Sequence, residues 1–114
     1  MVKSLSLLTR KAGMSHEEFI DKWTNEHAPL AHAVPGLVRY VLSYVNANPV
    51  RPDIPRHGIE VDGVAELWYD NAEDMRRALA SPQMKALRDH GATIIGRIET
   101  FTTVERQIIP RVGA

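Results

Sequence analysis

The chain has 114 residues, of which 44% are hydrophobic and 25% are charged, and its 14 basic residues balance its 14 acidic ones. These values are typical of a single globular domain, here residues 1–114, and not of a disordered or repetitive chain. The balanced charge offers no basic face to nucleic acid. The absence of cysteine excludes disulfides, thiolate nucleophiles and zinc–thiolate sites. Because no apolar run is long enough for a signal peptide or a membrane span, we expect a cytoplasmic protein without a membrane partner.

A strand and then a long helix are expected first. Serines alternate with leucines over residues 2–9, which predicts the strand. Ser15 with Glu18 three residues later is a capping-box pattern, so the helix should begin at His16. Apolar residues then recur at helical spacing. The inner stripe of this helix is expected to comprise Phe19, Trp23, His27, Leu30 or Ala31, and Val34.

The end of this helix combines two features that rarely occur together. His27 continues the apolar stripe, and Pro29 follows two residues later. Proline lacks a backbone N–H and ends or kinks a helix, so we expect a main helix followed by a short second turn. Either His27 is a core histidine bonded to a backbone carbonyl, or the helix end is a place where something binds.

Three more strands are predicted, over residues 37–46, 63–70 and 96–105. Between the last two, Asn71 and Ser81 are positioned to cap two consecutive helices. The resulting order predicts an α+β protein with a ferredoxin-like βαββαβ fold, a four-stranded antiparallel sheet with helices on one face. The segment 46–62 contains three prolines and no periodicity. It is either a pocket wall or lid, or a passive crossover between strands.

The strands at 37–46 and 63–70 are apolar on both of their faces. Two helices cover only one face of a four-stranded sheet, so something else must cover the other. We expect this to be the same face of a second copy related by a two-fold axis. The predicted assembly is a homodimer whose sheets face each other.

Three stretches of the sequence resemble the EthD family of small dimeric α+β-barrel proteins. They are EHAPLAHAVPGLVRYVL at 26–42, VDGVAELWYDN at 61–71 and FTTVE at 101–105. Within that family the chain is most similar to the methylmuconolactone methylisomerases, with which it shares elements like MSHEEF, PGLVRY, ANP and DHG…IIG. The resemblance implies one EthD-like dimeric α+β-barrel domain over residues 1–114. It also implies that the chain works without a cofactor.

The same resemblance implies a site between the sheet and the helix end. In the methylisomerase-like members, a histidine and a tyrosine that match His27 and Tyr40 serve the lactone site, and both are present here. One position departs from the pattern, because Asp53 stands where the isomerases have a histidine. The substrate is therefore not implied to be the same.

The candidate catalytic residues are His27, Tyr40 and His90. An imidazole titrates near neutral pH, so His27 is a candidate general base or acid. The hydroxyl of Tyr40 could donate to a carbonyl or a developing enolate, although a tyrosine on a strand also packs well. His90 precedes Gly91 at an expected helix C-terminus, where the helix dipole stabilises a cationic ring for purely structural reasons.

The candidate substrate-binding residues are Trp23, Glu66, Trp68 and Phe101. The three aromatic side chains could line an apolar pocket or belong to the core. Glu66 lies between apolar neighbours and is a candidate acid unless an arginine of a neighbouring strand pairs with it. The arginines considered for this role are Arg39 and Arg97.

No metal or cofactor is expected. His27, Glu66 and His90 could form a two-histidine, one-carboxylate set only if they converged in space, and their spacing does not call for it. His90 could ligate haem, but no clear cluster of basic residues is available for the propionates.

These residues favour an enzyme of organic-compound catabolism that acts on a small, partly apolar molecule. The predicted chemistry is proton transfer in a lactone or related carbonyl compound, leading to isomerisation, cyclisation or rearrangement. Two alternatives stay open: a non-catalytic carrier or accessory protein of the ether-degradation type, and a cofactor-free oxidoreductase.

Overall fold

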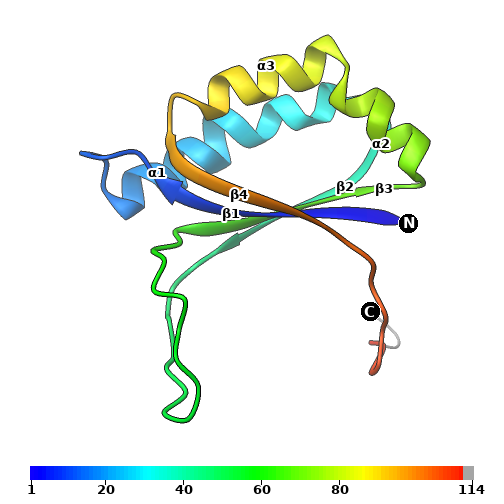
Figure 1. Cartoon of the computed structure of the whole chain (residues 1–114). Coiled ribbons are helices and arrows are strands. Elements are labelled where there is room, and N and C mark those ends of the chain that lie inside the picture. The colour runs from blue at the N-terminus through cyan, green and yellow to red at the C-terminus, as the bar shows by residue number, and fades with distance from the viewer. Residues whose placement is uncertain (112–114) are drawn as a thin grey trace.

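The computed structural model describes residues 1–111, and in it a four-stranded antiparallel sheet carries all helices on one face (Figure 1). The strands lie in the order β2-β3-β1-β4. With a helical segment between β1 and β2 and another between β3 and β4, this is the ferredoxin-like βαββαβ arrangement. The predicted fold is therefore confirmed. The strands are β1 (Val2–Arg10), β2 (Leu37–Tyr44), β3 (Gly63–Tyr69) and β4 (Ile95–Thr103).

The helices begin where the sequence predicts. Ser15, Asn71 and Ser81 each accept a hydrogen bond from the backbone N–H three residues later, which satisfies a donor that a helix start leaves free. The first helical segment has three parts, α1 (His16–Lys22), the π-helix η1 (Trp23–His27) and the 3-10 helix η2 (Ala28–Ala33). The second comprises α2 (Ala72–Leu79) and α3 (Pro82–Gly91).

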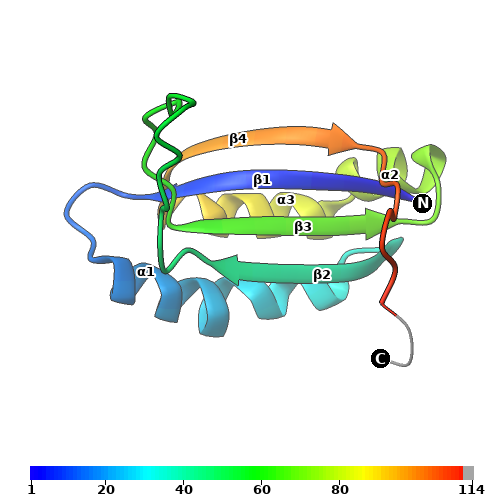
Figure 2. The same ribbon diagram turned by 90° about the horizontal axis from the view of Figure 1, so that it is seen from below.

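The sheet has two different sides, which we call the helix face and the open face. Figure 2 shows the open face toward the viewer, with the helices behind it. On β1 the serines Ser4 and Ser6 are buried on the helix face, and Leu5 and Leu7 alternate with them on the open face. The register carries this alternation across the sheet, because Ser6 pairs with Ala65 and Leu5 pairs with Glu66.

The core lies between the helix face and the helices and has two parts that share Tyr40 and Leu67. Trp23 is fully buried in one of them and packs directly on the backbone of β3. A Cβ atom at Gly63 would lie 2.3 Å from the Trp23 ring, so only glycine allows this contact. The predicted inner stripe is confirmed, with Ala31 and not Leu30 buried.

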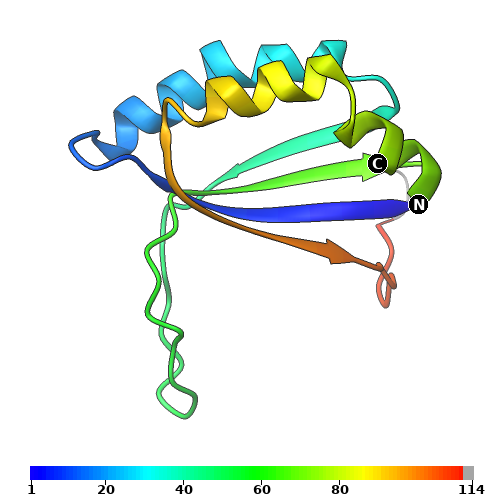
Figure 3. The same cartoon turned by 45° about the horizontal axis from the view of Figure 1, so that its top comes forward.

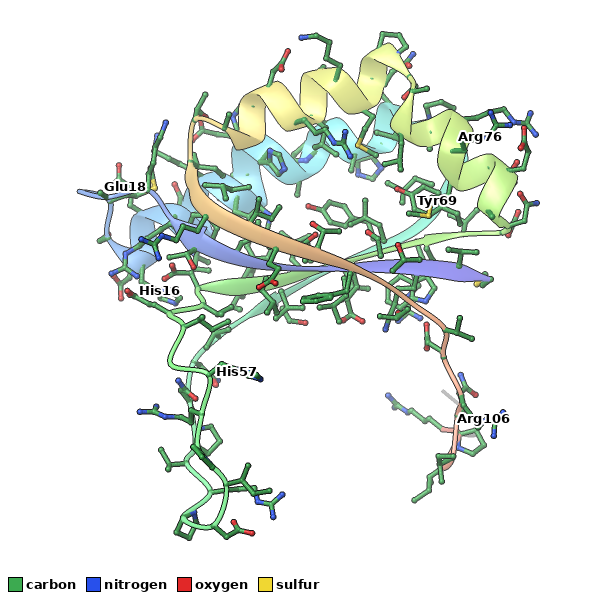
Figure 4. The ribbon with its side chains drawn as sticks, in the orientation of Figure 1. His16, Glu18, His57, Tyr69, Arg76 and Arg106 are labelled. Atoms are coloured by element: carbon green, nitrogen blue, oxygen red, sulfur yellow. The ribbon has the colours of Figure 1, made fainter. Side chains whose placement is uncertain are left out.

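Two segments extend away from the sheet on the open-face side (Figures 1 and 3). One is the loop at 45–62, and the other is the tail at 104–111 that follows β4. Figure 4 shows His57 and Arg106 on these segments, whereas Tyr69 lies between the sheet and the helices. The loop does not cover the helix face of its own chain. Its residues 58–61 instead form one wall of an open groove of about 1260 Å³ beside β1 and β4.

Candidate functional site

His27 occupies the last position of the π-helix η1. The Ala28 N–H bonds to the carbonyl of Trp23, five residues back, so the turn contains one residue more than an α-helical turn. Single π turns inside helices are frequent at functional sites. The wide turn places His27 on the same buried side as Trp23, with only 6% of the residue exposed. Pro29 then falls in the first turn of η2, where its missing N–H costs little.

The His27 ring meets the ring of His90 at the end of α3. Their Nδ1 atoms are 3.0 Å apart, and the rings are stacked with their centroids separated by 5.2 Å. The backbone of α3 permits this approach because the next residue is Gly91, where a Cβ would lie 3.2 Å from Cε1 of His27. His27 is therefore not bonded to a backbone carbonyl, which was the structural alternative for this residue.

Burial changes the chemistry of His27. Burial, and to a smaller extent the nearby His90, lower the pKa of the ring from 6.5 to about 4. The ring is thus neutral at neutral pH. Its Nδ1 is bonded to His90, while Nε2 has no hydrogen-bond partner in residues 1–111. A neutral imidazole with a free ring nitrogen has the form of a general base.

Tyr40 approaches the same layer from β2. Burial raises the pKa of its hydroxyl, so the hydroxyl keeps its proton at neutral pH and is a hydrogen-bond donor. The indole N–H of Trp23 approaches the Tyr40 hydroxyl and opposes this rise in its pKa, although the geometry of the two groups falls short of a hydrogen bond. Within the described residues the Tyr40 hydroxyl has no partner either, and no bond joins it to His27.

Trp23 adds an unsatisfied polar group to this layer. Its indole N–H is completely buried and finds no acceptor in the described part of the chain. A buried donor without a partner costs roughly 1–3 kcal/mol, and such groups are uncommon in native structures. His27, Tyr40 and Trp23 thus each carry a polar atom that the described protein groups leave unpaired.

A groove of about 440 Å³ runs along the outer edge of β2, beside this layer. Tyr40 lines it together with Thr24, Ala28 and Ala31, which flank His27 on its own helical segment. This volume is within the range of pockets that bind small organic molecules. The larger groove near the long loop contains none of the candidate catalytic residues.

Three other candidate residues lie on the opposite side of the sheet. Glu66 and Trp68 alternate with Ala65 and Leu67 along β3 and face the open side, and Phe101 is paired with Leu5 on that same side. Phe101 is 46% exposed. The structure therefore brings together His27, His90, Tyr40 and Trp23, and separates this group from the other three residues.

The partner of Glu66 differs from the expected arginines. Its carboxylate bonds to Nζ of Lys3 at 2.7 Å, because Lys3 lies on the neighbouring strand on the same face. Arg39 instead stacks on the ring of Trp68, with its guanidinium 4.4 Å from the centroid. A metal set of His27, Glu66 and His90 is ruled out by this geometry, and no cluster of three or more potential metal-ligating residues occurs among residues 1–111.

Two features were not predicted from the sequence. Ser6 and Thr100 share a hydrogen bond of 2.8 Å on the helix face, and both are small hydroxyl residues in strands. The carboxylate of Asp62, buried at the base of the long loop, accepts bonds from Arg10 and contacts His16 at 2.7 Å. Burial alone would raise the pKa of Asp62, but these hydrogen bonds outweigh it and lower that pKa. In the sequence, the local signal for this network was an aspartate, Asp62, directly before the strand β3.

Residues 11–97 match the EthD domain. The chain belongs to the EthD family. Its sequence is 31% identical over 106 residues to the 4-carboxymethyl-4-methylbutenolide mutase of Pseudomonas reinekei, covering 92% of this chain and 98% of that protein.

Solved structures share the fold. An EthD family protein from Bacillus halodurans has a TM-score of 0.74 at 21% identity and covers 93% of this chain and 99% of its own. A dimeric ferredoxin-like protein of unknown function from Thermobifida fusca has a TM-score of 0.67 at 12% identity, over 91% and 90% of the two chains. The cofactor-independent oxygenase SnoaB from Streptomyces nogalater has a TM-score of 0.63 at 19% identity, over 96% and 97%.

In the part of this EthD protein that the structure describes, no helix is both long and apolar enough to cross a membrane.

Proposed function

We propose that this EthD protein is a cofactor-independent enzyme that moves a proton within a small lactone or related carbonyl compound. The observations that carry the proposal are the neutral, buried ring of His27, whose Nε2 has no partner among the described residues, and the protonated hydroxyl of Tyr40 in the same layer between the helices and the sheet. Both groups come from the layer between the helices and the helix face. The mutase from Pseudomonas reinekei, which acts on a lactone according to its name, supports this substrate class.

The chemistry follows from the states of these two groups. The Nε2 atom of His27 removes a proton from the carbon next to the substrate carbonyl, and the electron pair moves onto the carbonyl oxygen. Tyr40 donates its hydrogen bond to that developing oxyanion, which lowers the barrier most when water is excluded. Return of the proton to another atom of the substrate completes an isomerisation.

We place the second copy of a homodimer on the open face. Leu5, Leu7, Val41 and Val64 lie there half-buried in the single chain, and the exposed Phe101 adjoins them. The dimeric ferredoxin-like neighbour supports this assembly. In this arrangement Trp68 and Phe101 contact the second copy rather than the substrate, and the reaction takes place on the helix side of each sheet.

The test is turnover of 4-carboxymethyl-4-methylbutenolide, followed by NMR of the product. We expect His27→Ala to abolish turnover, while circular dichroism and the melting temperature show a folded protein. His57→Ala, which removes an exposed histidine of the long loop, is the control. Full turnover by a folded His27→Ala variant would sink the mechanism.

A second candidate is cofactor-independent oxygenation, for which the oxygenase SnoaB shares the fold. The same base would generate a carbanion, and molecular oxygen would then be the oxidant. Oxygen consumption during turnover distinguishes the two, because an isomerase consumes none. Tight binding of the lactone without either reaction would favour the carrier alternative.

A further inference from the structure

We infer that His90 completes a proton relay with His27, so that when Nε2 of His27 takes a proton from the substrate, the proton on Nδ1 of His27 passes to His90 and the buried ring stays neutral. The inference rests on the proposed function and deepens it. His90 would not touch the substrate; it would act through His27 as a positioning and proton-accepting residue.

The contact between the two rings is built for proton exchange. The Nδ1 atoms are 3.0 Å apart, which is an ordinary hydrogen-bond distance. Each neutral imidazole carries one N–H, so one Nδ1 donates and the other accepts. The carbonyl of His90 accepts from the N–H and the hydroxyl of Thr93, which holds the end of α3 in place. A larger residue than Gly91 would push His27 away from this geometry.

The two tautomers of the pair differ in what His27 presents to the substrate. When His90 donates, Nδ1 of His27 accepts and its Nε2 carries a hydrogen, so that Nε2 is an acid. When His27 donates, its Nε2 holds a free electron pair and is a base. One form becomes the other when a proton moves between the two Nδ1 atoms, while Nε2 of one ring loses a proton and Nε2 of the other ring gains one.

The relay moves the positive charge of the proton-transfer step from His27 to His90. The substrate proton binds Nε2 of His27 while the proton on Nδ1 of His27 passes to Nδ1 of His90. His27 stays neutral throughout, as its burial requires, and the positive charge appears on His90. That ring is half-buried and lies in the last turn of α3, where the helix dipole favours a cation. His90 then loses a proton to solvent, or returns it in the reverse step.

Three variants test the relay with 4-carboxymethyl-4-methylbutenolide as the probe. His90→Gln keeps a hydrogen-bonding group but cannot pass a proton, and we expect kcat/KM to fall about 10- to 100-fold. Solvent deuterium should also enter the product less than in the wild type. His90→Ala should regain rate when free imidazole is added. His57→Gln, at an exposed histidine of the long loop, is the control and should keep the wild-type rate and deuterium content. Wild-type turnover and deuterium content in His90→Gln would overturn the relay.

A second measurement does not depend on turnover. Nitrogen-15 NMR of histidine-labelled protein follows the protonation of both rings as the pH is lowered. The relay requires the first proton to be taken up by the His90 ring, with His27 neutral until about pH 4. If His27 takes up the first proton, the relay is wrong. If the titration order is as expected but the lactone is not converted, the relay stands as a property of the pair and the proposed reaction is wrong.

Discussion

The two faces of the same sheet have opposite chemistry. The helix face carries Tyr40 and small hydroxyl residues beneath two stacked histidines, and the buried indole N–H of Trp23 in this layer has no protein partner in residues 1–111. The open face carries apolar side chains, and its charged residue Glu66 is already paired with Lys3. Because strand residues alternate, neighbours such as Tyr40 and Val41 belong to different faces. One layer of backbone therefore separates the residues suited to a reaction from those suited to association.

Changing two adjacent residues of β2, one on each face, tests which face the reaction uses and has the largest expected effect. We expect Tyr40→Phe to lower kcat for the lactone about 10²- to 10³-fold, because it removes one donor to the oxyanion. Val41→Ala, one residue further along the chain, should leave kcat nearly unchanged. Steady-state kinetics of both variants is the measurement. Equal losses would mean that the reaction uses the open face.

The converse test concerns association. Leu5→Asp places a charge on the open face, and we expect the dimer dissociation constant to rise about 100-fold or more, as for the loss of a central interface contact. Leu30→Asp, on the exposed side of η2 with 38% of the residue accessible, is the control. Sedimentation equilibrium measures both. Unchanged association of Leu5→Asp would place the second copy elsewhere.

The contact between Trp23 and β3 can be tested through stability. Gly63→Ala introduces a Cβ 2.3 Å from the Trp23 ring, and we expect a loss of about 3 kcal/mol in the free energy of unfolding. Gly13→Ala is the comparison. A Cβ at Gly13 meets no atom within 4 Å, so its loss of stability comes only from the φ of 85°, which disfavours alanine. Urea titrations compare the variants, and a loss at Gly63 no larger than at Gly13 would contradict close packing.

The buried state of His27 predicts a pH dependence of stability. Its pKa is lowered from 6.5 to about 4, so between these values the unfolded chain binds more protons than the folded one. The free energy of unfolding should therefore decrease as the pH falls from 6.5 to about 4, by about 3 kcal/mol. His27→Gln should lose this component. The carboxylates contribute equally to the pH dependence of both proteins, so subtracting one free energy of unfolding from the other removes their contribution. The absence of any difference would mean that His27 is not buried.

The sequence predicted the fold well because its signals are local. Ser15, Asn71 and Ser81 start their helices by bonding to groups three residues away, and strand alternation is visible over a few residues. The site was predicted only in part. His27 was identified by its place at the helix end and by the resemblance to the EthD family, and Tyr40 by that resemblance, but Glu66 and Trp68 were grouped with them although they face the other side.

Contacts between distant residues could not be predicted in this way. The bond of His27 to His90 joins positions 63 residues apart, and the network of Asp62 with His16 joins two segments that the sequence shows as unrelated. Lys3 rather than an arginine pairs with Glu66 because strand register decides which side chains are neighbours. The π turn also had no signal beyond Pro29.

The π turn before His27 also bears on how such a protein could change in evolution. Successive residues of an α-helix are separated by about 100° around its axis. The π turn holds one residue more than an α-helical turn. Deleting one residue between Trp23 and His27 would therefore restore α-helical winding and keep the imidazole on nearly the same side, because positions three apart in an α-helix lie on one face. A single-codon insertion or deletion at this point could thus widen or narrow the turn beside His27 without a change of fold and without moving Phe19 or Trp23 out of the core.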